Sequence, residues 1–257
     1  MTGAKLRGAL QKMVSSPHTV LPYTHSKDTD TWDALCDLDQ DPADKNTVML
    51  IYKQKSDLAE NQGKPSGWNR EHLWPRSFGV GDSGADTTDL HHLRPADWTV
   101  NSARSNLPFG WCNASSACRD MPAHAEADSS TGKDSKTFMP PTSVRGDIAR
   151  ALMYMAVRYD GSDPGSQRLS LSDCPCQHTA TMGILSVLLQ WHAGDPPSAL
   201  EIERNDKVRH YTRRWQPHVC RTWPGLSRVS VIFCTCAMCR PFSVYQAMRL
   251  TSRRLQL

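Results

Sequence analysis

The chain lacks any long hydrophobic run. Hydrophobic residues make up 39% of its 257 residues, yet no run is long enough to cross a bilayer as a helix. The N-terminus also lacks the apolar core of a secretory signal, because Leu6, Leu10 and Val14 recur with helical spacing. No internal repeat or low-complexity segment is present. These absences argue against a membrane-spanning protein and favour one compact domain.

Acidic residues are absent after Asp206, whereas residues 208–257 contain nine arginines. The whole chain has a formal charge of +4, but residues 1–207 carry 21 basic and 26 acidic groups, a net charge of −5. A uniformly basic nucleic-acid-binding surface is therefore excluded for this larger part. Any phosphate must be attracted there by local placement of arginines or of a metal ion.

The nine cysteines lack the pattern of a zinc module. Cys234-x-Cys236-x-x-Cys239 has no fourth ligand at a matching spacing. Cys112 and Cys118 are close enough in sequence to close a small disulfide, whereas Cys174-Pro-Cys176 is too strained to bond internally. The odd number leaves at least one free thiol, so the cysteines do not settle the redox compartment.

Apolar periodicity predicts an α+β domain, mixed but mainly helical. We expect helices at about 3–15, 30–38, 145–159 and 179–193, and a further helix that begins with a capping box at Ser198. The apolar run 48–52 is typical of a buried strand. The polar stretch 53–68 is predicted to be a loop, and 113–142 a long surface loop.

Chemistry-bearing side chains gather in the run Asn69-Arg70-Glu71-His72 and around Asn101. Hydrolysis of a phosphodiester needs a base that makes a nucleophile at neutral pH, and cations that offset the developing charge. His72 is a candidate base, and Glu71 and Asn101 offer the hard oxygens that Mg²⁺ prefers. Adjacent side chains point to opposite faces of a strand, so Glu71 and His72 share a site only where the strand ends, as Trp74-Pro75 indicates.

Four longer segments resemble the bacterial-type endonuclease I family: NREHLWP, TDLHHLRPADWTVNSARSN, RGDIARALMYMAVRY and LLQWHAGDPPSALEIERND. The resemblance runs from Thr2 to Val208 in family order. It implies a ββα-metal (His-Me finger) unit in which His72 is the general base and Glu71 and Asn101 are the metal ligands. It also implies a low-specificity, secreted nuclease for DNA and also RNA that uses Mg²⁺, with Ca²⁺ or Mn²⁺ as alternatives. We expect a monomer.

The arginines are harder to assign. One branch of the family stabilises the phosphorane with an arginine between the two motifs, but Phe78 to Asp86 contains none. The resemblance leaves this role to Arg76, Arg94, Arg104 or none of them, and we favour Arg104. We expect Arg70, Arg76 and Arg94 to bind nucleic acid. Alternatively, Arg70 and Arg94 pair with Asp86 or Asp89, as many surface guanidiniums do for little gain.

Residues 208–257 are predicted to be an atypical tail outside a nuclease domain that covers residues 1–207. The family normally continues after its ERND segment with a sequence close to IQGNRNPF, which is absent here. Val208 to Pro224 can be back-translated so that a frame one base later encodes a similar stretch, which indicates an out-of-frame or disordered tail. The alternative is a genuine basic tail that binds nucleic acid.

Two further functions stay open at this point. The chain could be an inactive or vestigial nucleic-acid-binding homologue whose C-terminus is disrupted. A weaker hypothesis is a structural metal-binding module built on the cysteines. Substitution of His72 distinguishes an active nuclease from both alternatives, because only in the active enzyme does loss of the imidazole lower a rate of cleavage.

Overall fold

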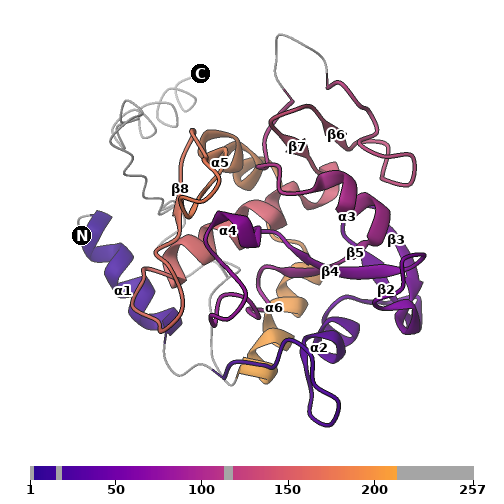
Figure 1. The fold of residues 1–257 in the computed structure, drawn as a ribbon, viewed down its shortest axis with the longest axis horizontal. Helices are drawn as coiled ribbons and strands as arrows, with labels where there is room; N and C mark the ends of the chain where they lie inside the picture. The colour runs from indigo at the N-terminus through magenta and orange to yellow at the C-terminus, as the bar shows by residue number, and fades with distance from the viewer. Residues whose placement is uncertain (1–2, 16–18, 113–117, 213–257) are drawn as a thin grey trace, which may run out of the picture.

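A computed structural model describes residues 3–15, 19–112 and 118–212 as a mixed α+β fold, as predicted. Helices surround several small sheets (Figure 1). The α-helices of the described part are α1 (Gly3–Ser15), α2 (Thr31–Leu38), α3 (Trp98–Arg104), α4 (Arg145–Arg158), α5 (Leu185–Gly194) and α6 (Ala199–Thr212). Short 3₁₀ turns lie at η1 (Ala59–Asn61), η2 (Arg76–Phe78) and η3 (Thr142–Val144).

The strands are short. An antiparallel sheet contains β1 (Gln40–Asp41), β2 (Asp44–Leu50) and β3 (Lys55–Leu58). Three two-stranded sheets pair β4 (Trp68–His72) with β5 (Leu93–Asp97), β6 (Gly132–Lys133) with β7 (Phe138–Met139), and β8 (Ser170–Leu171) with β9 (Thr181–Met182). The last pair is parallel and the other two are antiparallel.

The main core forms around α4, which runs through the middle of the molecule and packs against α1 and α5 (Figure 1). Its predicted apolar stripe of Ile148, Ala151, Leu152 and Met155 is buried, which confirms the helix expected at 145–159. The helix expected at 3–15 is also present. Of the residues Leu6, Leu10 and Val14, which recur with helical spacing, only Val14 is buried, and the other two are partly exposed.

Helix α2 confirms the prediction for residues 30–38. The Asp30 side chain accepts hydrogen bonds from the backbone N–H groups of Trp32 and Asp33. In turn, the Asp33 side chain accepts from the backbone N–H of Asp30, so a capping box fixes the start of the helix. Leu35 then packs in a second cluster with residues of β2, β4 and β5. Through this cluster α2 supports the β4–β5 hairpin.

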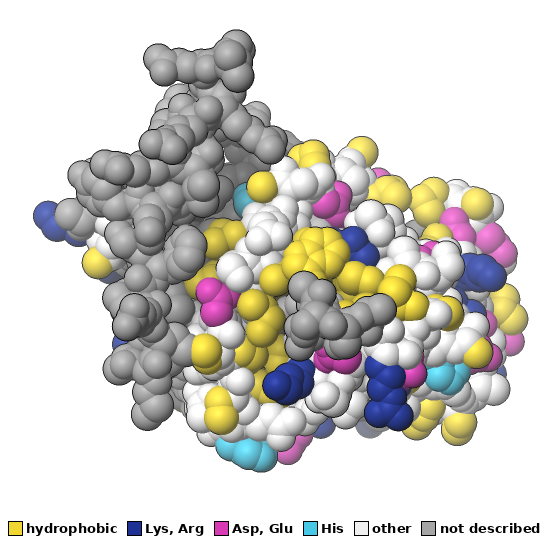
Figure 2. Space-filling model, turned by 90° about the horizontal axis from the view of Figure 1, so that it is seen from above, with side chains coloured by type: hydrophobic (Ala, Val, Ile, Leu, Met, Phe, Trp, Pro, Cys, Tyr) yellow, Lys and Arg dark blue, Asp and Glu magenta, His cyan; other side chains and the backbone are white. Residues whose placement is uncertain are grey.

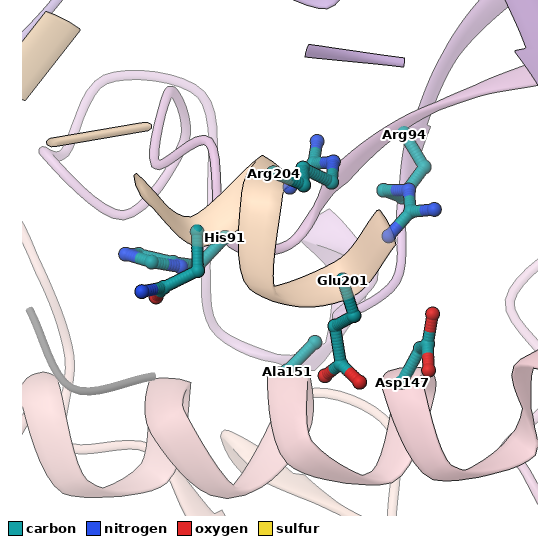
Figure 3. A pocket seen from close by; sticks show the side chains of 7 residues that line it. His91, Arg94, Asp147, Ala151, Glu201 and Arg204 are labelled. Atoms are coloured by element: carbon teal, nitrogen blue, oxygen red, sulfur yellow. The ribbon is translucent and has the colours of Figure 1, made fainter. Parts of the chain in front are cut away.

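Buried charges attach α6 to the rest of the fold. The Arg204 guanidinium pairs with both carboxylate oxygens of Asp39 at 2.8 and 2.9 Å and donates to the carbonyls of Leu90 and Leu93. Nearby, Arg150 of α4 pairs with Glu201 of α6. Figure 3 shows the small polar pocket between these elements, where side chains of α4 and α6 face Arg94. The helix begins as predicted, because Ser198 Oγ accepts from the backbone of Glu201 at 3.1 Å.

One strand prediction and two loop predictions need correction. The buried run 48–52 forms strand β2 only as far as Leu50, and Ile51 and Tyr52 continue as buried turn residues. The stretch 53–68 contains β3 and η1, because β3 pairs back onto β2 from Thr47↔Leu58 to Leu50↔Lys55. The loop 113–142 holds the short strands β6 and β7, and its residues 113–117 lie outside the described part.

The helix expected at 179–193 begins six residues later, at Leu185, and ends at Gly194. Ala180 has a φ of 54°, which an α-helix does not accept, and Thr181–Met182 pair with β8 instead. Sheet pairing therefore prevails over the weak helical pattern at the start of this segment.

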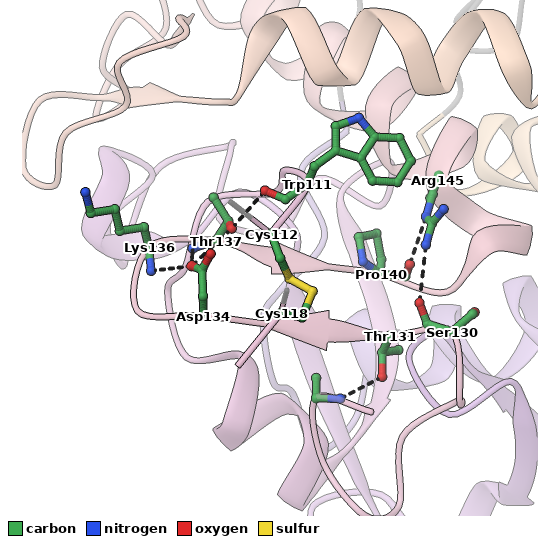
Figure 4. Close-up of a disulfide and its surroundings, with 11 residues drawn as sticks. Trp111, Cys112, Cys118, Ser130, Thr131, Asp134, Lys136, Thr137, Pro140 and Arg145 are labelled. Atoms are coloured by element: carbon green, nitrogen blue, oxygen red, sulfur yellow. Dashed lines mark hydrogen bonds between the residues drawn. A yellow bond between two sulfur atoms is a disulfide. The ribbon is translucent and has the colours of Figure 1, made fainter. Parts of the chain in front are cut away.

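The cysteine predictions are confirmed where the structure describes them. Cys112 and Cys118 form a disulfide beside Trp111 (Figure 4). Cys176 carries a free thiol, so no bond closes the Cys174-Pro-Cys176 pair, and Cys36 is free as well. Cys234, Cys236 and Cys239 lie outside the described residues.

None of the helices in the described ranges combines the length and the apolar character needed to cross a membrane. Helix α6 continues past residue 207 to Thr212, and Val208 is buried beside Ala34, Leu38 and Leu90. Residues 213–257 lie outside the described part. The separate tail at 208–257 stays a prediction.

We predict that Arg204→Ala destabilises the fold by roughly 1–3 kcal/mol, because the Leu90 and Leu93 carbonyls lose a donor and the buried Asp39 keeps only Arg94 as a cationic partner. The matched control is Arg209→Ala, an exposed position on the same helix, for which we expect less than about 0.5 kcal/mol. Urea unfolding of both variants measures the difference. Equal effects would show that the Arg204–Asp39 pair does not secure α6.

Stability should also depend on the ionisation of Asp147. Burial, with the Glu201 carboxylate nearby, raises the pKa of Asp147 to about 6. Below both pKa values this group is protonated in the folded and the unfolded chain, so its unfavourable charge costs stability only as the pH rises through about 4 to 6.

We therefore compare the free energy of unfolding of Asp147→Asn with that of the wild type. From pH 4 to pH 7 the difference should shift in favour of the variant by roughly 1–3 kcal/mol. Urea unfolding at both pH values measures this gain. Glu60→Gln, at an exposed carboxylate, is the control and should show no such change. A pH-independent difference for Asp147→Asn would contradict the raised pKa.

Candidate active site

The candidate site is built on the β4–β5 hairpin and on α3, which follows β5 directly. The antiparallel register pairs Asn69 with Ala96 and Glu71 with Arg94. The Asp97 side chain caps α3 by accepting from the backbone of Thr99 and Val100. Strand, strand and helix thus follow one another in the order that the ββα prediction requires.

Side chains of β4 alternate between two surroundings, as the strand geometry demands. On one side, Asn69 accepts a hydrogen bond from Asn101 of α3 at 2.7 Å, and Glu71 pairs with Arg104 at 3.2 Å. On the other side, Arg70 and His72 both contact Tyr23. The strand ends at His72, so the Glu71 and His72 side chains leave the last two positions of β4 on opposite sides.

Glu71 is a buried carboxylate with its own supporting partners. Its Oε1 accepts from the Tyr52 hydroxyl at 2.5 Å and pairs with the Arg104 guanidinium. Burial raises the pKa of Glu71, while Arg104, Tyr52 and a hydrogen bond from Asn101 act in the opposite direction. Glu71 and Asn101 are thus adjacent, as a shared ligand role requires.

Arg104, the predicted catalytic arginine, is 1% exposed and lies beneath the end of β4. It donates to the carbonyl of Leu73 at 3.0 Å and to that of His72 at 3.4 Å, and its Cζ lies 4.6 Å from the Phe109 ring centroid. Its guanidinium therefore binds Glu71 and the strand backbone in the interior.

His72 is held by a loop that precedes β5. Its Nε2 lies 3.0 Å from the carbonyl of Thr87, and because a carbonyl only accepts, Nε2 carries the proton and Nδ1 is left to act as a base. Burial lowers the pKa of His72 well below its usual value, and the nearby His92 and Arg76 lower it further. The His72 imidazole is therefore neutral at pH 7.

The loop that carries Thr87 is anchored to α4. Asp89 accepts from the hydroxyl of Tyr159 at 2.7 Å and from that of Tyr154 at 3.0 Å. Of the two adjacent histidines only His92 faces the candidate base, with ring centroids 5.3 Å apart. The ring of His91 packs instead against Tyr154. One histidine of this pair therefore lies beside the candidate base.

The three arginines assigned to nucleic acid lie in different surroundings. Arg94 pairs with Asp39 at 3.0 Å in the interior, so the alternative partners Asp86 and Asp89 are wrong. Arg70 lies between the Tyr23 and Trp32 rings, at 3.5 and 3.9 Å from their centroids. Arg76 pairs with Asp82, and 38% of its side chain is exposed.

Surface charge offers no broad basic face in the view of Figure 2. Among the described residues on that face, Lys and Arg side chains are interspersed with Asp and Glu. This distribution agrees with the net charge of −5 for residues 1–207. The prediction that local arginines or a metal ion hold the phosphate stays a prediction.

Sequence reasoning missed Tyr23, Tyr52 and Thr87. Tyr52 ends an apolar run and carries no signal beyond burial, and Tyr23 lies in a polar segment far from the motif. Thr87 acts through its backbone carbonyl, so its side-chain type gives no signal in the sequence. Only tertiary contacts reveal these three.

The donor set at Glu71 and Asn101 fits a hard cation. A carboxylate and a carboxamide offer the oxygen ligands that Mg²⁺ takes together with water and substrate oxygens. Across the described ranges, no cluster of three or more His, Cys, Asp or Glu side chains is placed to hold a metal. A site with few protein ligands is therefore the arrangement that these residues allow.

Comparisons with known proteins identify relatives over most of the chain. The family model described as Endonuclease I matches residues 2–222. The chain is 41% identical to an extracellular ribonuclease of Bacillus amyloliquefaciens over 210 residues, which cover 80% of this chain and 67% of the relative. It is 39% identical, with the same coverage, to an extracellular ribonuclease of Bacillus subtilis (strain 168).

The anchored loop gives a testable prediction. Tyr159→Phe removes one donor to the buried Asp89 and should cost roughly 1–3 kcal/mol of stability. It should also speed amide hydrogen exchange in residues 86–92, which carry Thr87. Tyr211→Phe, whose hydroxyl binds Asp37 on α2, is the control and should leave exchange in this loop as it is. Unchanged exchange in Tyr159→Phe would show that the loop is held by other contacts.

Proposed function

Since the chain belongs to the endonuclease I family, we propose that this nuclease is a metal-dependent endonuclease that hydrolyses phosphodiester bonds with little sequence specificity. One observation carries the proposal. A neutral imidazole, tied at Nε2 to the Thr87 carbonyl, ends strand β4, and the preceding residue Glu71 is hydrogen-bonded to Asn101. These groups match the base and the hard oxygens that the reaction needs.

His72 supplies the base in this proposal. Its Nδ1 takes the proton from a water molecule, and the Thr87 carbonyl keeps the ring in the orientation and tautomer that this step requires. The lowered pKa keeps the imidazole unprotonated at neutral pH. We infer that β4, β5 and α3 form the ββα-metal unit, with His72 at the end of its first strand.

Glu71 and Asn101 are the residues that would hold Mg²⁺, or Ca²⁺ or Mn²⁺ in its place. When bound, such an ion offsets negative charge on the phosphate and on the leaving oxygen. Arg104 and Tyr52 hold the Glu71 carboxylate from the interior, so their contacts support a positioning role. For Arg104 these contacts favour that role over direct contact with the phosphate.

RNA is the substrate class that the relatives favour, since both are named extracellular ribonucleases. We propose that the chain cleaves RNA and, as a low-specificity endonuclease, DNA as well. The Cys112–Cys118 disulfide suits an oxidising, extracellular environment such as the names of those relatives indicate. The alternative is an inactive nucleic-acid-binding homologue, which would bind RNA without cutting it.

Cleavage assays separate these functions. We expect purified protein to cut single-stranded RNA and plasmid DNA with Mg²⁺ and not with EDTA. His72→Ala should lower the rate by a factor of about 10² or more while the protein stays folded and still binds RNA. Glu71→Gln should raise the Mg²⁺ concentration needed for half-maximal activity.

His210→Ala removes an exposed histidine on α6 and serves as the matched control, with wild-type activity expected. Full activity in His72→Ala would remove this residue from the base role. RNA binding without cleavage by the wild-type protein would favour the inactive homologue.

A further inference from the structure

Tyr23 stands at the centre of a cluster that includes the candidate base. Its ring centroid lies 5.8 Å from that of His72, 3.5 Å from Cζ of Arg70 and 4.7 Å from Cζ of Arg76. Two guanidiniums and one imidazole thus share a single half-buried aromatic ring. The π face of a tyrosine attracts cations, so the ring offsets the repulsion between the two arginines.

Arg70 fastens Tyr23 in this place. Its guanidinium donates to the Tyr23 carbonyl, to Thr31 Oγ1 at 2.9 Å and to Thr24 Oγ1 at 3.1 Å. Thr31 Oγ1 also donates to the Tyr23 carbonyl at 2.8 Å. These bonds connect β4 to the segment before α2, and they occupy Arg70 with the protein's own groups.

Arg76 differs from the other arginines near the site. Arg94 and Arg104 lie in the interior and pair with the buried carboxylates of Asp39 and Glu71. Arg76 pairs at 2.8 Å with Asp82, whose side chain is 81% exposed. An exposed pair of this kind contributes little stability, so an incoming anion can replace the Asp82 carboxylate at small cost.

The position of Arg76 relative to the base is also favourable. The Arg76 guanidinium and the His72 imidazole contact the same Tyr23 ring, at 4.7 and 5.8 Å from its centroid. A substrate phosphate that approaches His72 therefore meets Arg76. Guanidiniums bind phosphate oxygens through paired donors, a geometry that an ammonium group does not offer.

We propose that Arg76 binds a phosphate of the nucleic-acid substrate beside His72, displacing Asp82, and that Tyr23 is the residue that positions Arg76. Tyr23 fixes the guanidinium before substrate arrives, so less side-chain freedom is lost on binding. This inference rests on the proposed endonuclease activity.

A double-mutant cycle tests the proposal with the full chain, single-stranded RNA and Mg²⁺. We expect Arg76→Ala to lower kcat/KM by a factor of ten or more, and Arg76→Lys to restore only part of it. Tyr23→Leu should lower kcat/KM severalfold, and Tyr23→Phe should recover most of that loss because the ring remains. In the Arg76→Ala background, Tyr23→Leu should cost little more, because its effect passes through Arg76.

Salt dependence supplies a readout that a purely structural role would not move. The slope of log kcat/KM against log salt concentration should be shallower by about 0.7 in Arg76→Ala, as one contact to a single-strand phosphate is lost. Asp82→Asn should raise kcat/KM, since the competing carboxylate is gone. Lys45→Ala removes a charge at an exposed position of β2 and is the control, with unchanged kinetics.

The outcomes distinguish this inference from the proposed function. Wild-type kcat/KM and salt slope in Arg76→Ala would overturn the phosphate role, and additive losses in the double mutant would overturn the positioning role of Tyr23. Thermal unfolding of each variant shows whether it is folded. If Tyr23→Leu is unfolded, the positioning role of Tyr23 is judged from the kcat/KM values of Tyr23→Phe and Arg76→Lys instead. No Mg²⁺-dependent cleavage by the wild type, or full activity in His72→Ala, would instead refute the proposed function.

Discussion

Burial of the Glu71 carboxylate against Arg104 is the interaction on which the rest of the site depends. A carboxylate that is 3% exposed needs a cation and hydrogen-bond donors, and Arg104 and Tyr52 supply them from α3 and from the turn after β2. This pair joins the β4–β5 hairpin to α3. It also keeps a carboxylate beside Asn101.

Strand geometry then determines where the base lies. Because Glu71 faces α3, His72 must face the other way, toward Tyr23 and the loop 86–92. That loop fixes the imidazole through the Thr87 carbonyl, and Asp89 fixes the loop to the hydroxyls of Tyr154 in α4 and of Tyr159 just after it. The central helix of the core therefore supports the candidate base through two steps of hydrogen bonding.

Much of this could be predicted from local sequence, and the rest depends on tertiary contacts. Periodicity predicted α1 and α4, a capping box predicted the start of α6, and a short spacing indicated the Cys112–Cys118 disulfide. The sequence motif alone indicated that Glu71, His72 and Asn101 belong to one candidate site. The partners of Arg94 and Arg104 were not, because Asp39 and Glu71 are distant in sequence and charge pairing has no local pattern.

The central claim is that Glu71 and Asn101 form the metal site next to His72. A crystal structure of the chain with Mn²⁺, with data collected at the manganese absorption edge, tests it most directly. The account predicts an anomalous peak with oxygens of Glu71 and Asn101 at roughly 2.0–2.4 Å. A peak bound by other residues, or none at a Mn²⁺ concentration that supports cleavage, would contradict it.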